Sequence, residues 1–190
     1  MPPAHRPDLN AVTAVAESLA DALELSAQFD EASHALQLAR RTRSDVGGLI
    51  RLMRKSGVIM ERLGKYRQAL RWYGRGLTAA VQLEEPTASL AEGDLALAYS
   101  GVRFRQGRLH EALKWAHRAE SIGRRLDDPK IIAHSSYLLT AGYAMLRRPE
   151  VAEYDQVSLP VYEQLGDPVG QGNVLNNLGA NARDDSHLHQ

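Results

Sequence analysis

Cysteine is absent from this chain of 190 residues. Disulfide bonds and thiol chemistry are therefore excluded, and a reducing compartment is allowed. Lysine and arginine together number 23, and so do aspartate and glutamate, which leaves no net charge. Because contact with nucleic-acid phosphates usually appears as a basic excess, we expect no direct nucleic-acid partner.

Long apolar runs are also missing. No run approaches the roughly 18 residues that a membrane-spanning helix requires. The amino terminus, MPPAHRP, has no apolar signal region. We therefore expect a soluble, cytoplasmic protein without membrane association. The three prolines near the start predict a flexible arm over residues 1–8.

Recognisable catalytic, metal-binding and cofactor-binding motifs are lacking as well. His110 and His117 lie seven residues apart and share one helix face, but a metal site needs further ligands. Gly170 and Gly172 lack the preceding strand and the third glycine of a dinucleotide-binding loop. We predict no catalytic residues, no metal, no cofactor and no enzymatic activity.

The stretch from Met53 to Leu77 has the pattern of two helices joined by a tight turn. Apolar residues recur there at three- and four-residue spacing, which places them on one helical face. Gly64 interrupts the pattern, as a residue able to adopt the left-handed conformation beyond a helix end. The small residues Gly57, Ala69 and Gly76 mark where the two helices approach closely.

This pattern recurs along the chain. The segment Gly64–Leu70 returns as Gly107–Leu113, 43 residues later, and weaker copies begin at Ala27 and Arg147. A second signal, leucine followed by an acidic pair or glycine-aspartate and then proline, occurs at residues 83–86, 126–129 and 165–168. In each, the acidic residue is expected to cap a new helix whose first residue is the proline. Two independent markers in register indicate a helical repeat.

The order of small and aromatic residues resembles the tetratricopeptide repeat, a helix–turn–helix unit of roughly 34 residues. The resemblance implies an all-α superhelix, an α-solenoid, of about four helix pairs plus a terminal helix. The expected array covers residues 9–183, with repeats at about 11–43, 45–83, 86–126 and 129–165, a terminal helix at 168–183 and a flexible tail at 184–190. Repeats near 40 residues that end in this proline motif look most like the arrays of bacterial signalling and transcription regulators.

In such arrays the first helix of each pair lines a concave groove. The resemblance assigns the partner-binding groove to Arg51, Arg54, Lys55, Arg62, Leu97, Phe104, Arg105, Tyr137, Leu138, Met145, Asn173, Asn176 and Asn177. Glu17, Asp21 and Glu24 of the first repeat, Asp94 of the third and His134 of the fourth occupy the same positions. The apolar members either bind a partner or pack against one another. The basic cluster either binds acidic groups of a partner or neutralises the acidic repeat beside it.

Two functions are compatible with this pattern. The first is a non-enzymatic protein–protein interaction module that binds a peptide or partner segment in the groove. The alternative is an effector-sensing regulatory domain of a bacterial transcription or signalling regulator. The terminal helix is expected to pack through Val174, Leu175, Leu178 and Ala182, and a homodimer partner is a candidate to cover its far side. Trp72 and Trp115 occupy the same repeat position and are expected to pack between repeats.

Overall fold

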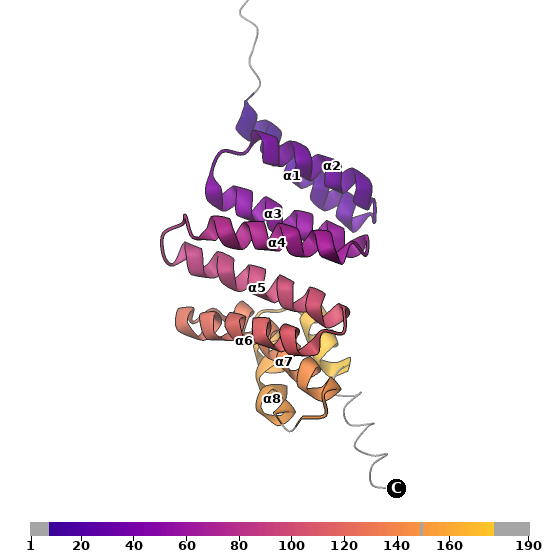
Figure 1. Ribbon diagram of the computed structural model, residues 1–190, viewed down its shortest axis with the longest axis vertical. Helices are drawn as coiled ribbons and strands as arrows, with labels where there is room; N and C mark the ends of the chain where they lie inside the picture. Colours follow the sequence, from indigo (N-terminus) through magenta and orange to yellow (C-terminus); the bar gives the residue numbers. More distant parts are fainter. Residues whose placement is uncertain (1–7, 149, 177–190) are drawn as a thin grey trace, which may run out of the picture. The chain divides into compact units, whose positions relative to one another are not determined.

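The computed structural model describes residues 8–148 and 150–176, and this part of the chain contains helices and no strand (Figure 1). The helices are α1 (Leu9–Leu25), α2 (Phe29–Thr42), α3 (Val46–Arg62), α4 (Tyr66–Ala80), α5 (Thr87–Arg105), α6 (Leu109–Leu126), α7 (Pro129–Met145) and α8 (Val151–Gln164). Helical residues continue from 168 to 176. No helix in the described part is long and apolar enough to cross a membrane.

Helices that follow one another in the chain pack as pairs: α1 against α2 and α3 against α4, with α7 packed against both α6 and α8. The chain divides into two compact units, which we call the N-terminal unit (residues 1–91) and the C-terminal unit (residues 92–190). The sequence prediction of an all-α array of helix pairs is confirmed.

The predicted capping chemistry is present at the starts of α3 and α7. Asp45 accepts a hydrogen bond from the backbone N–H of Gly48, and Asp128 accepts one from Ile131 at 2.9 Å, with Pro129 as the first helical residue. These bonds satisfy N–H groups that have no partner within the first turn.

Two predicted starts need correction. α5 begins at Thr87 rather than at Pro86, and the carboxylate of Glu85 accepts a hydrogen bond from the hydroxyl of Ser89 at 2.7 Å. Asp8, which was expected in the flexible arm, is the N-cap of α1, because its carboxylate accepts from the N–H of Asn10.

The turns inside the four helix pairs share one backbone conformation. Gly64 and Gly107 have φ angles of 69° and 71°, and the corresponding residues Ala27 and Arg147 have 57° and 52°. Glycine adopts this left-handed region without steric cost, whereas alanine and arginine do so at some expense. The repeat pattern therefore located all four turns, including the two that lack glycine. Pro149, which precedes α8, lies outside the described residues.

In the N-terminal unit, an aromatic ring of one helix packs against a residue without a side chain on the preceding helix. A Cβ atom at Gly57 of α3 would overlap the ring of Tyr73 of α4, which is fully buried. The Tyr73 hydroxyl donates a hydrogen bond to Glu61. The predicted close approach at Gly57 is thus confirmed. On α1 the buried positions are Thr13, Ala16 and Ala20, whereas Leu19 is half-exposed.

The C-terminal unit has a core made from α5, α6 and α7. Its buried residues include Ala96, Leu97, Leu113, Ala116, Ala119, Ile131, Leu138 and Leu139. Trp115 packs on this core and stacks on Tyr99, with ring centroids 4.4 Å apart. A second cluster joins Ala133, Tyr162 and Val174.

The second cluster confirms the predicted packing of Val174 and corrects that of its neighbour. Leu175 is 54% exposed, because it lies one residue further around the helix from the buried face. Leu178 and Ala182 lie outside the described residues.

Candidate functional site

Charged side chains predicted to line the groove neutralise one another in the N-terminal unit. The guanidinium of Arg51 donates two hydrogen bonds to the carboxylate of Glu17, at 2.8 and 2.9 Å. The ammonium of Lys55 lies 3.0 Å from Glu17 and 2.6 Å from Asp21. The Arg51 bond is the main cause that lowers the pKa of Glu17 to about 2. Of the two roles considered for the basic cluster, neutralisation of the neighbouring acidic helix is therefore the one found for Arg51 and Lys55.

The other two predicted basic residues differ from each other. Arg62 lies 3.6 Å from Glu24, which makes a fourth ion pair between α3 and α1. Arg54 makes no ion pair within the described part of the chain. It is half-buried close to Tyr73, where its charge opposes the rise in the tyrosine pKa that burial causes.

Two of these ion pairs have a regular sequence spacing. Glu17 and Arg51, and likewise Asp21 and Lys55, are 34 residues apart. The corresponding turn residues Ala27 and Gly64 are 37 residues apart, so each base lies three residues, about one helical turn, before the position that corresponds to its acidic partner. An acid-to-base match at this spacing is a sequence signal that predicts such pairs.

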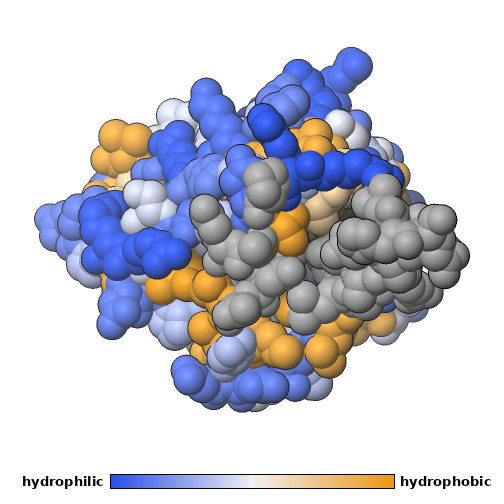
Figure 2. Space-filling view, turned by 90° about the horizontal axis from the view of Figure 1, so that it is seen from below, coloured by the Kyte–Doolittle hydropathy of each residue, from blue (hydrophilic) through white to orange (hydrophobic). Residues whose placement is uncertain are grey.

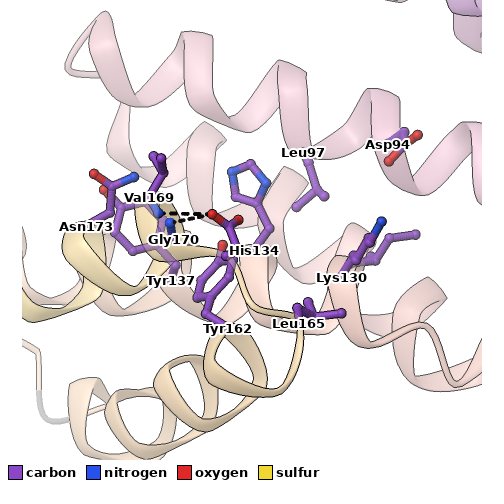
Figure 3. A pocket seen from close by; sticks show the side chains of 12 residues that line it. Asp94, Leu97, Lys130, His134, Tyr137, Tyr162, Leu165, Val169, Gly170 and Asn173 are labelled. Atoms are coloured by element: carbon purple, nitrogen blue, oxygen red, sulfur yellow. Dashed lines mark hydrogen bonds between the residues drawn. The ribbon is translucent and has the colours of Figure 1, made fainter.

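The C-terminal unit contains a cavity of about 520 Å³ (Figure 3). Its lining comes from α5, α7, the end of α8 and the helical residues after 168. The lining residues are Asp94, Leu97, Lys130, Ile131, His134, Tyr137, Tyr162, Leu165, Asp167, Val169, Gly170 and Asn173.

Local sequence explains how the walls of this cavity are held. On α7, Lys130, His134 and Tyr137 recur at four- and three-residue spacing, which aims them to one side of the helix. Asp167 accepts hydrogen bonds from the N–H groups of Val169 and Gly170, at 3.1 and 3.0 Å, and so fixes the start of the last helical segment. These two bonds are the dashed lines in Figure 3.

A glycine sets the distance between two walls. A Cβ atom at Gly170 would overlap the ring of Tyr162, so the absence of a side chain lets the last helical segment lie directly on this ring. Tyr162 is 8% exposed, and burial raises the pKa of its hydroxyl to about 12, with the charge of Asp167 acting in the same direction. Tyr162 is therefore a neutral hydrogen-bonding group over the ordinary pH range.

The cavity combines apolar surface with polar groups at its ends. In the view of Figure 3, Asp94 and Lys130 lie toward one end and Tyr137 and Asn173 toward the other. Within the described residues, neither Asp94 nor Lys130 makes an ion pair, and the Asn173 amide makes no hydrogen bond. These groups are available to a ligand, in contrast to the paired charges of the N-terminal unit.

The predicted groove residues of the C-terminal unit lie in different environments in the structure. Leu97, Tyr137 and Asn173 line the cavity, together with Asp94 and His134. Leu138 is buried in the core. Phe104 is half-buried, whereas Met145 and Asn176 are exposed, and none of the three lines the cavity. Partial desolvation lowers the pKa of Arg105 beside Tyr137, although Arg105 does not line the cavity. Asn177 lies outside the described residues.

Sequence reasoning did not assign to the groove Lys130, Ile131, Tyr162, Leu165, Asp167, Val169 and Gly170. Lys130 could have been found from the sequence, because it lies four residues before the predicted groove residue His134 and so shares its helix face. Tyr162 and Leu165 belong to a second helix and the turn after it, so a template restricted to first helices does not include them.

The surface that Figure 2 shows is mixed in character. Figure 2, which views the molecule from below, has hydrophobic side chains exposed in several places between hydrophilic ones. The described residues contain no group of three or more histidine, cysteine, aspartate or glutamate side chains able to hold a metal ion.

Comparison with known structures decides the fold type. Aspartyl phosphate phosphatase F from Bacillus subtilis superposes with a TM-score of 0.82 at 12% sequence identity, over 97% of this chain and 49% of that one. The apo form of RapI gives a TM-score of 0.75 at 12% identity, over 95% and 51%. A putative kinesin light chain of Podosopora anserina with TPR-like repeats gives 0.60 at 13% identity, over 95% and 99%. The fold is of the tetratricopeptide-repeat type.

Tetratricopeptide-type domains typically take part in protein interactions. No protein-family model matches this chain, and a search of curated proteins finds no match. The chain spans about half the length of the phosphatase F and RapI structures. At these identities the likeness establishes the tetratricopeptide-type fold and not a shared activity.

Proposed function

We propose that this chain is a non-enzymatic protein-interaction module whose C-terminal unit holds a peptide or partner segment in the cavity described above. The observation that carries the proposal is the lining. Leu97, Tyr137 and Asn173 were predicted as groove residues from repeat position alone, and all three belong to one recess. This convergence supports a binding surface on the first helices.

The chemistry of the recess suits an extended peptide segment. Leu97, Tyr162 and Leu165 offer apolar surface for a side chain of the partner. The Asn173 amide has both donors and an acceptor, so it can pair with a peptide backbone. Tyr137 is half-buried in the free protein. An aromatic side chain that a partner covers completely usually governs how long a complex lasts, whereas exposed charges govern how fast it forms.

Selection of peptides from a random library displayed on phage, against the immobilised full chain, tests the proposal. Selected peptides are then measured for binding kinetics on the parent protein and on Tyr137→Ala. We expect Tyr137→Ala to raise the dissociation rate about tenfold, because the variant loses an anchor that is desolvated in the complex. Asn173→Ala should weaken binding through the same site.

A matched control lies on the same helical segment. A Cβ atom at Gly172 has no atom within 4 Å, so Gly172→Ala should leave binding unchanged. Lys55→Ala in the N-terminal unit should also leave it unchanged, because Lys55 pairs with Glu17 and Asp21. Selected peptides that bind Tyr137→Ala and Asn173→Ala with parental kinetics would contradict the cavity as the site.

An effector-sensing domain is the second candidate function, and the size of the cavity favours it. A volume of about 520 Å³ lies within the roughly 300–1,000 Å³ range of small-molecule sites. A thermal-denaturation screen with a library of small metabolites distinguishes the two functions. A compound that stabilises the parent but not Tyr137→Ala, while no library peptide binds, would favour effector sensing.

A further inference from the structure

The second helices of the N-terminal unit carry a cation cluster that the proposed function does not use. Arg40 of α2 stacks over the ring of Trp72 of α4, with its guanidinium carbon 4.3 Å from the ring centroid. Arg75, which follows Trp72 by about one turn of α4, lies over the same ring, with its guanidinium carbon 4.9 Å from the centroid. One indole thus organises two guanidinium groups from two helices.

Arg40 is held in place by a buried hydroxyl. One of its terminal N–H groups donates to the Ser56 hydroxyl, and Ser56 in turn donates to the Leu52 carbonyl at 2.7 Å. Ser56 is 4% exposed, so this anchor is part of the packed interior. The planar guanidinium therefore has a fixed orientation, with its other N–H groups left to bind something else.

No carboxylate within the described residues pairs with Arg40 or Arg75. Two arginines close to them in the sequence do have carboxylate partners, because Arg43 pairs with Asp45 and Arg51 with Glu17. Burial lowers the pKa of Arg40, and the charge of Arg75 lowers it further. An unpaired cation beside a second cation is electrostatically unfavourable, and a bound anion would relieve both.

We propose that Arg40, Trp72 and Arg75 form a binding site for an oxyanion presented by an acidic segment of a partner protein. Guanidinium groups donate paired hydrogen bonds to carboxylates and phosphates, which supplies the recognition chemistry. The surroundings have the complementary charge, because α4 carries Arg67, Arg71 and Arg75 and no acidic residue.

A nucleic acid fits this site less well than an acidic protein segment. Nucleic acids stack their bases on exposed aromatic rings, whereas the ring of Trp72 is already covered by guanidinium groups. The chain also has no net positive charge to attract a polyanion over long distances.

Fluorescence of Trp72 provides a direct test on the full chain. Trp115→Phe removes the other tryptophan, which lies in the C-terminal unit, and leaves Trp72 as the sole reporter. A hexaglutamate peptide with blocked ends is titrated against this protein. We expect a saturable change in Trp72 emission, because the bound carboxylates partly neutralise the two cations that lie over the ring, and an affinity that falls with added salt.

Single-residue variants then assign the site. Arg40→Gln and Arg75→Gln should each weaken the peptide about tenfold, since each removes a charge-assisted hydrogen bond. Arg75 is exposed, so Arg75→Gln is expected to keep the parental circular dichroism spectrum. Arg71→Gln is the matched control, because it removes the same charge from α4, whereas the guanidinium groups that lie over the Trp72 ring are those of Arg40 and Arg75. We expect less than a twofold change in affinity.

Three results would overturn the proposal. The first is the absence of a saturable Trp72 response to hexaglutamate. The second is an equal loss of affinity in Arg71→Gln and Arg75→Gln, which would mean unspecific charge attraction. The third is saturation by inorganic phosphate but not by the peptide, which would make free phosphate the ligand. Tyr137→Ala should leave hexaglutamate binding unchanged. The proposal for this site and the proposal for the cavity of the C-terminal unit are therefore tested independently.

Discussion

The first helices of the N-terminal unit and those of the C-terminal unit present different surfaces at equivalent repeat positions. In the N-terminal unit these positions hold ion pairs such as Arg51 with Glu17. In the C-terminal unit they hold a cavity wall, to which Leu97 and Tyr137 contribute. Position in the repeat therefore defines the direction of a side chain, whereas the side chains of the neighbouring helix decide whether it remains accessible to a ligand. The same position is closed by an opposite charge in one unit and left open in the other.

The largest expected effect is on stability, from Leu138→Ala. Leu138 was predicted as a groove residue, but it is buried between α7 and its neighbours. We expect a loss of about 3 kcal/mol in the free energy of unfolding, since removal of a buried leucine leaves a cavity. Chemical denaturation measures this, with Lys55→Ala as the contrast, where we expect less than about 1 kcal/mol. Equal, small losses in both variants would mean that Leu138 belongs to the surface.

The next effect concerns the helix contact in the N-terminal unit. Gly57→Ala should cost about 2 kcal/mol, because the added methyl group would displace the buried ring of Tyr73. Gly74→Ala on α4 is the control. No atom lies within 4 Å of its added Cβ, and the substitution should stabilise the helix by up to about 1 kcal/mol. Thermal unfolding of the two variants should therefore shift in opposite directions.

The equivalent contact in the C-terminal unit should be less sensitive. Ser100 lies 43 residues after Gly57, and its buried hydroxyl donates to the carbonyl of Ala112 at 2.8 Å. Ser100→Ala should cost about 1 kcal/mol, the usual net value of one hydrogen bond. Denaturation with urea measures the difference. A loss as large as that of Gly57→Ala would mean that the two helix pairs pack in the same way despite their different side chains.

The smallest effect is the pH dependence of the ion pairs. Glu17 has a pKa of about 2 in the folded protein against 4.5 ordinarily, so its pairing stabilises the fold above pH 4.5. That contribution is lost as the pH falls from 4.5 through 2. Because the pair faces solvent, we expect about 1 kcal/mol rather than the full value of the shift. Unfolding of the parent and Glu17→Gln at several pH values should differ at pH 6 and converge near pH 2.

Much of the helical framework could be predicted from the sequence, because its causes are local. The turn at Gly107 and the cap at Asp128 depend on residues within a few positions of each other. α6, Leu109–Leu126, begins just after the predicted turn at Gly107 and ends where the predicted third repeat ends. The predicted helix start at Pro86 was wrong, because α5 begins one residue later. The carboxylate before the proline accepts a hydrogen bond from the hydroxyl of Ser89.

The candidate site was only partly predictable. Repeat position identified Leu97, Tyr137 and Asn173, because all first helices point the same face inward. It could not identify Tyr162, which reaches the cavity from a second helix once Gly170 allows close packing.

By itself, the amino-acid sequence determined the helix pairs, their turns and the inward face of each first helix, since these depend on spacing and on residues close along the chain. Only the tertiary structure decided which inward side chains remain open to a partner. Arg51 meets Glu17 across 34 residues, whereas Asp94 and Lys130 meet no opposite charge within the described part of the chain. The outcome depends on which side chains adjacent helices bring within hydrogen-bonding distance, and that distance is set by the packing of the helices.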